Sequence, residues 1–84
     1  MATQNKQVTK IWTEVSTVSV VITPNEKTWS MIEFATATAL PAGIMGTPLK
    51  NGESAAVSVR SGEKVYARSV GFDNSVTLVL ELIV

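Results

Sequence analysis

The sequence contains no cysteine and no histidine, and its seven basic residues balance its seven acidic ones. Without cysteine the chain forms no disulfide, and without both residue types a zinc site is not expected. A net charge of zero gives no general attraction to nucleic acid or to an anionic membrane. The polar start lacks an apolar signal core, and no run approaches the roughly 20 apolar residues of a membrane span. We expect a soluble protein that is made in a cytoplasm and binds neither nucleic acid nor membrane.

Catalytic groups are also missing from the sequence. A nucleophile usually needs a neighbouring base, most often histidine, and here there is none. The acidic residues are scattered, and most of them fall at turns or at polar positions of alternating strands. Gly71-Phe72-Asp73 is a lone tripeptide and neither a phosphate loop nor a calcium loop. We therefore expect no enzyme, no metal and no cofactor.

The composition favours β-structure. Valine, threonine and serine make up more than a third of the 84 residues, and β-branched residues suit the half-buried surface of a sheet. A single domain of this size has a thin core, which small proteins reinforce with disulfides, metals or oligomerisation. Because neither a disulfide nor a metal site is expected here, we expect a homo-oligomer.

Residues 50–70 give the clearest local pattern. Val57 and Val59 alternate with polar residues before Gly62, and Val65 and Ala67 alternate after it. This pattern predicts a β-hairpin closed by the three-residue loop 60–62, with Gly62 in the left-handed conformation.

The rest of the chain supplies further strands. Residues 1–10 read as a polar N-terminal arm, either frayed or ordered by a partner, followed by one β domain over residues 11–84. Residues 11–23 form a long strand whose apolar parity switches near Ser16-Thr17, which suits a bend serving two sheets. After Thr23-Pro24, a turn or a helix start is possible, but the residues that follow favour strand over helix in residues 28–39.

The last third of the sequence contains one loop and one very apolar strand. Residues 40–51 hold two prolines and two glycines and are predicted as a loop. Residues 75–84 are apolar on both faces, so we expect this strand inside a sheet or against a second subunit. Taken together, these segments predict an all-β fold, a small antiparallel β-sandwich or barrel of six to seven short strands.

Apolar and aromatic residues are the candidates for a protein interface, because aromatic residues and arginine are enriched there. Each also has a structural interpretation: the tryptophans as core or rim, the loop residues as a plug of the sandwich, and Tyr66 with Arg68 as an exposed cross-strand pair. The candidate interface residues are Trp12, Trp29, Ile44, Met45, Leu49, Tyr66, Arg68, Leu82 and Val84.

Two segments carry a resemblance to a known group of proteins. Pro48-Leu49-Lys50-Asn51-Gly52-Glu53-Ser54, followed by Gly62-Glu63-Lys64-Val65-Tyr66-Ala67-Arg68-Ser69, resembles small β-rich virion proteins of tailed bacteriophages. The similarity covers roughly the C-terminal half and is a pattern of turns and strands. It implies a capsid decoration (cement) protein, a homotrimer on the capsid surface of the virion that bridges subunits of the major capsid protein. No functional residue is carried over.

Two alternatives remain beside this interpretation. The same scaffold would suit a tail, fibre-base or head–tail connecting part of the virion. A small barrel that binds single-stranded nucleic acid would use aromatic and basic side chains, here the aromatic residues Trp12, Trp29, Tyr66 and Phe72 and the cations Lys64, Arg68 and Arg60. Neutral net charge argues against the second alternative.

Overall fold

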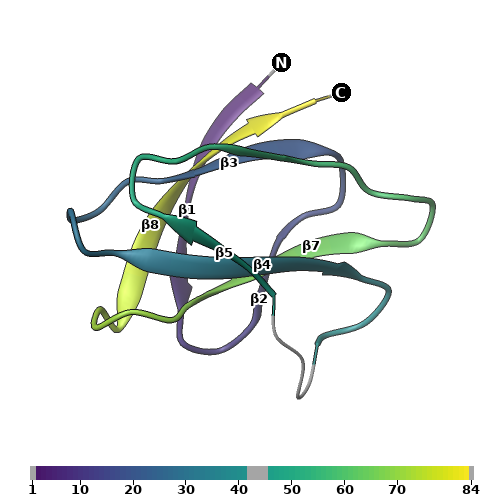
Figure 1. Cartoon of the computed structure of the whole chain (residues 1–84). Coiled ribbons are helices and arrows are strands. Elements are labelled where there is room, and N and C mark those ends of the chain that lie inside the picture. The colour runs from purple at the N-terminus through teal and green to yellow at the C-terminus, as the bar shows by residue number, and fades with distance from the viewer. Residues whose placement is uncertain (1, 42–45, 84) are drawn as a thin grey trace.

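The computed structural model describes residues 2–41 and 46–83 and has two antiparallel sheets of four strands each (Figure 1). Sheet A has the strand order β1-β8-β3-β6, and sheet B has the order β2-β7-β4-β5. The strands are β1 (Ala2–Thr9), β2 (Thr13–Ser16), β3 (Val20–Pro24), β4 (Met31–Ala37), β5 (Thr47–Lys50), β6 (Ala55–Val57), β7 (Lys64–Ser69) and β8 (Ser75–Leu82). The all-β prediction is confirmed, with eight strands in place of six or seven. No helix in these ranges is long and apolar enough to cross a membrane.

The core lies between the two sheets and follows the period-2 pattern of the sequence. Val20 and Ile22 of β3, Leu78 and Leu80 of β8, and Ile32 of β4 are fully buried in it. The intervening residues of the same strands point to the outer faces. The alternation seen in the sequence is therefore the division between core and surface.

The chain changes sheet at almost every connection. Only β4 and β5 are consecutive in sequence and also paired with each other. The predicted hairpin over residues 50–70 is therefore wrong: β6 pairs with β3 in sheet A, whereas β7 pairs with β2 and β4 in sheet B. Alternation shows that Val57 and Val65 both face a core, but it does not distinguish one shared sheet from two facing ones.

The two turns that flank β6 share one design. Residues 50–53 and 60–63 each have a cation first, glycine third and glutamate fourth. In both, the glutamate N–H donates to the first carbonyl and the glutamate carboxylate accepts the first N–H, at 2.8 Å for Lys50 and 3.0 Å for Arg60. Gly52 and Gly62 have φ values of +85° and +84°, so left-handed Gly62 is confirmed.

The N-terminal residues are not a frayed arm. Ala2–Thr9 form β1, which pairs with β8 from Ala2↔Leu82 to Thr9↔Ser75 without a register shift. Among residues 3–9 of this strand, Val8 is the one buried apolar residue of the core, so the hydrophobic pattern gave no signal. The backbone groups of β8 need a partner on this side, and β1 supplies it.

The sheet switch near Ser16-Thr17 is confirmed. β2 belongs to sheet B and β3 to sheet A, and the β2–β7 register shifts between Glu14 and Ser16. Ser16 Oγ accepts the N–H of Val18 and donates to its carbonyl, which holds the bend between the strands.

The strand prediction for residues 28–39 is confirmed over Met31–Ala37, which form β4, and the turn interpretation holds after Thr23, where β3 ends at Pro24. The predicted loop 40–51 was partly wrong, because residues 47–50 form β5. Pro48 fits there because β5 is an edge strand, where a missing N–H costs no ladder bond. β8 lies inside sheet A between β1 and β3. This confirms the first of the two positions expected for the last strand, inside a sheet.

Candidate functional site

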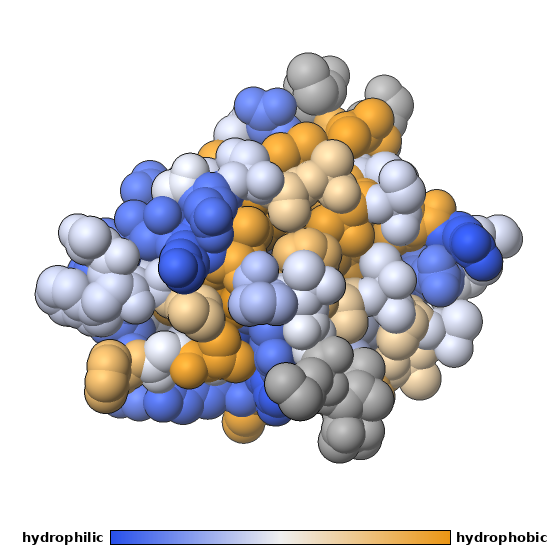
Figure 2. All heavy atoms as spheres, viewed as in Figure 1, coloured by the Kyte–Doolittle hydropathy of each residue, from blue (hydrophilic) through white to orange (hydrophobic). Residues whose placement is uncertain are grey.

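Three connections meet at one end of the sandwich and expose large apolar side chains there. Ile11 is 72% exposed between β1 and β2, Trp29 58% between β3 and β4, and Phe72 92% between β7 and β8, with Val70 beside it. We call these four residues the loop tip. Figure 2 shows hydrophobic atoms at this end, at the lower left of the view, among hydrophilic side chains. Four of the six large apolar side chains exposed in the described ranges thus belong to one region.

The carboxylate of Asp73 ties two of these connections together. Ser30 Oγ donates to Oδ2 at 2.5 Å, and the indole N–H of Trp29 donates to Oδ1 at 3.3 Å. The carbonyl of Asp73 accepts from Ser69 Oγ at 2.7 Å. Because Ser30 and Ser69 are buried, the aromatic loops are fixed on the body of the sandwich.

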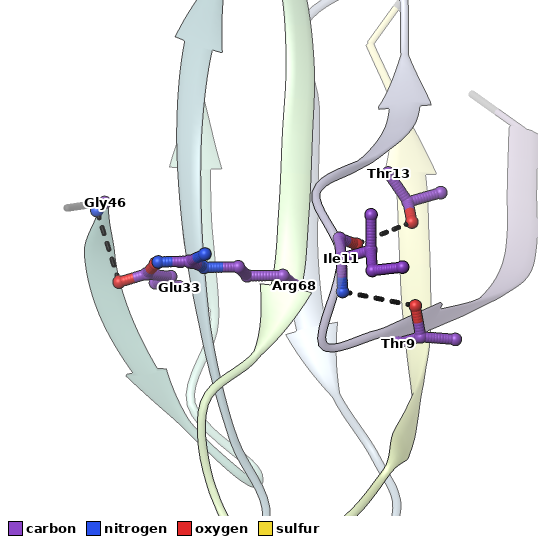
Figure 3. Close-up of polar contacts among 6 residues, drawn as sticks. All are labelled: Thr9, Ile11, Thr13, Glu33, Gly46 and Arg68. Carbon is purple, nitrogen blue, oxygen red and sulfur yellow. Dashed lines mark hydrogen bonds and ion pairs between the residues drawn. The ribbon is translucent and has the colours of Figure 1, made fainter. Parts of the chain in front are cut away.

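Backbone contacts complete the support of the loop tip. Val70 N–H donates to the carbonyl of Met31 at 3.0 Å, and Lys10 Nζ donates to the carbonyl of Gly71 at 3.1 Å. Ile11 is held by its own backbone, since its N–H donates to Thr9 Oγ1 and its carbonyl accepts from Thr13 Oγ1 (Figure 3). The exposed side chains are therefore presented by pre-ordered backbone.

Electrostatics at the loop tip favour an ionised Asp73. The hydrogen bond from Ser30 is the main reason that the pKa of Asp73 lies below its usual value of 3.8. Desolvation opposes this, while the Trp29 hydrogen bond and the charges of Lys27 and Lys10 lower the pKa further. The Lys27 ammonium also lies 5.5 Å from the centroid of the Trp29 ring.

This arrangement suits the binding of a protein surface. Exposed aromatic residues such as Trp29 and Phe72 are enriched in protein interfaces, and polar or charged neighbours are typical of an interface rim. Ordering these loops in advance lowers the entropic cost of association. Within residues 2–41 and 46–83 no cluster of metal-ligating side chains exists beside them.

Among the described residues that were predicted for an interface, only Trp29 lies at the loop tip. Leu49 is part of the core, and the half-buried Leu82 packs against that core. Trp12 and Tyr66 are buried, so the interpretation of Tyr66 as part of an exposed pair is wrong. Ile44, Met45 and Val84 lie outside the described residues.

Trp12 and Arg68 belong to a cluster on the outer face of sheet B. Glu33 Oε1 accepts from Arg68 Nε, and Glu33 Oε2 accepts from the N–H of Gly46 at 3.2 Å (Figure 3). The Arg68 guanidinium lies 4.7 Å from the centroid of the Trp12 ring. The indole N–H of Trp12 is buried without a hydrogen-bond partner among the described residues. These contacts make the cluster part of the packing of the sheet.

Sequence reasoning did not place Phe72, Val70 or Ile11 in a protein interface, although Phe72 is among the aromatic residues of the nucleic-acid alternative. Phe72 did carry a signal, since an aromatic residue at the centre of the turn Gly71-Phe72-Asp73-Asn74 has no strand face to bury it. Ile11 was assigned to a strand, and its exposure follows from the chain crossing between sheets at residues 10–12.

Comparisons with known proteins add no relative: no family model, no curated protein and no solved structure matches this chain.

Proposed function

We propose that this protein is a structural component of a tailed-phage virion, of the capsid decoration type, and that it binds the shell through the loop tip. The observation that carries the proposal is the group of exposed apolar side chains held by Asp73 at one end of the sandwich. The resemblance of residues 48–54 and 62–69 supplies the class of protein. The partner is the outer surface of the major capsid protein.

The mechanism requires no chemistry at the site. Each copy buries Phe72, Trp29 and their apolar neighbours against capsid subunits, and a ligand that binds only the assembled shell stabilises it by mass action. If one copy or one oligomer touches several subunits, the linked contacts add avidity. The shell then resists heat and internal pressure better than the undecorated one.

The first test is the copy number and position of the protein in purified virions. A decoration protein is present in numbers comparable to the major capsid protein and is distributed over the shell, as quantitative mass spectrometry and immunogold microscopy measure. A few copies confined to the tail or to one vertex would refute decoration and select the tail or connector alternative.

The second test concerns the surface. Phe72→Ala removes an exposed side chain, so the fold should persist while binding to undecorated shells weakens at least about thirtyfold if Phe72 is a hot spot. Ile83→Ala is the matched control, because Ile83 is also an exposed apolar residue (47%) and lies near the C-terminal end of β8. Equal binding by the two variants would refute docking through the loop tip.

The nucleic-acid alternative loses two of its candidate residues. Tyr66 is buried, and Arg68 is engaged by Glu33 and Trp12. Trp29 and Phe72 are exposed, and the Lys27 ammonium lies 5.5 Å from the Trp29 ring, so binding to an oligonucleotide at low salt is the measurement that decides this alternative.

A further inference from the structure

The sandwich has four edge strands, and they differ in how they are protected from pairing with another chain. β6 has three residues, β5 has four with Pro48 among them, and β2 has four with a register shift. Short strands, proline, bulges and charged side chains, lysine above all, are the usual devices that block an edge. β1 has eight residues, no proline or glycine, and no register shift. Within residues 2–41 and 46–83, β1 is the least protected edge, and its one such device is Lys6.

Alternate residues of β1 direct their N–H and C=O groups away from β8, as in any antiparallel pair. A strand that adds to this edge would satisfy those groups. The side chains are compatible with a neighbour of the same kind, because all are small or polar and only Lys6 is charged. Among the side chains of β1, the charged group that opposes self-pairing is the ammonium of Lys6.

The geometry of a two-fold pair decides whether Lys6 blocks it. A two-fold axis perpendicular to the sheet leaves the outer faces of both copies on the same side. Residues that lie opposite each other in the pair must therefore both be odd-numbered or both be even-numbered. With Asn5 on the axis, Lys6 lies opposite the partner's Gln4, and Thr3 lies opposite the partner's Gln7. This register uses nearly the whole strand and separates the two lysines. A shift that centred the pair on Lys6 would place like charges together.

We propose that two copies of this chain pair antiparallel through β1, with Asn5 on the two-fold axis, and join their A sheets into one eight-stranded sheet. The interface is isologous and closes as a dimer. It lies along β1, whereas the loop tip lies on the connections after β1, β3 and β7. The inference is independent of the proposed function, and it differs from the trimer that the resemblance implies.

A cysteine substitution tests the register, because the natural chain has no cysteine to compete. In the proposed pair the two Asn5 Cα atoms are about 4.5–5.5 Å apart, within disulfide reach. The two Gln7 positions are four residues out of register, about 13 Å apart along the strands. Mild oxidation should therefore cross-link Asn5→Cys into a dimer and leave Gln7→Cys uncross-linked. Both side chains are exposed, so both variants should fold.

Solution mass provides the second measurement. Light scattering after size exclusion should give a dimer for the natural chain, and Asn5→Lys should raise the dimer dissociation constant about fivefold or more through like-charge opposition. Circular dichroism checks that this variant remains folded. A monomer or a trimer for the natural chain, or equal cross-linking of the two cysteine variants, would overturn the proposal. Such a result would leave the virion copy number, and therefore the proposed function, untouched.

Discussion

The ion pair between Arg68 and Glu33 should contribute more to stability than a surface pair does. The Glu33 side chain is 9% exposed and that of Arg68 is 32% exposed. Glu33 also accepts the N–H of Gly46, and Arg68 stacks on Trp12. Removing either partner thus disturbs a group that is largely out of water.

The two single substitutions should not cost the same. Arg68→Ala leaves the Glu33 carboxylate buried with one backbone donor, which costs about 3–5 kcal/mol for a fully buried pair. Partial exposure of Arg68 reduces this, and loss of the contact with Trp12 adds about 0.5–1 kcal/mol, so we expect about 2–4 kcal/mol. Glu33→Ala should cost less, about 1–2 kcal/mol, because the remaining guanidinium reaches solvent and keeps its aromatic contact.

A double-mutant cycle measured by urea unfolding isolates the interaction of the pair. We expect a coupling free energy of about 1–3 kcal/mol between Arg68 and Glu33. Lys64 and Glu14 form the matched control on the same sheet, with side chains 43% and 46% exposed, and their coupling should stay below about 1 kcal/mol. If the Arg68–Glu33 coupling is no larger than that of the control, the argument from burial is refuted.

Three further substitutions test the packing and the loop tip. Leu80→Ala should lower the free energy of unfolding by about 3 kcal/mol, because Leu80 is fully buried in the core; a loss below about 1 kcal/mol would contradict this. Gly46→Ala should cost about 1–3 kcal/mol in the same assay, because a Cβ would lie 2.6 Å from the Phe34 carbonyl oxygen. Ser30→Ala should raise the pKa of Asp73 towards its usual value, as an NMR titration would show. Since folding lowers this pKa, the stabilisation is complete above about pH 4 and is lost at lower pH. Ser30→Ala should weaken that acid dependence, and an unchanged pKa would contradict the role given to Ser30.

The candidate site could be predicted only in part from the sequence. Trp29 was identified as an interface candidate, but its neighbours at the loop tip come from two other connections, 41 to 43 positions further along for Val70 and Phe72. Sequence distance gave no hint that Ser30 and Asp73 hydrogen-bond. The polar N-terminal residues likewise gave no hint of β1, because an edge strand needs backbone partners more than apolar side chains.

What the sequence by itself determined is local. Period-2 alternation specified which residues of β4, β7 and β8 face the core, the parity change at Ser16-Thr17 specified the sheet switch, and Gly62 specified a left-handed turn. These properties depend on backbone sterics and on side chains a few residues apart. The choice of strand neighbours was decided only in the tertiary structure. A strand buries its apolar face equally well in the sheet on one side of the core or in the sheet on the other side. The alternation in β6 and β7 therefore allows both strands to lie in one sheet or in two. The pairing of the whole set of strands, including β1 against β8, selected the second arrangement.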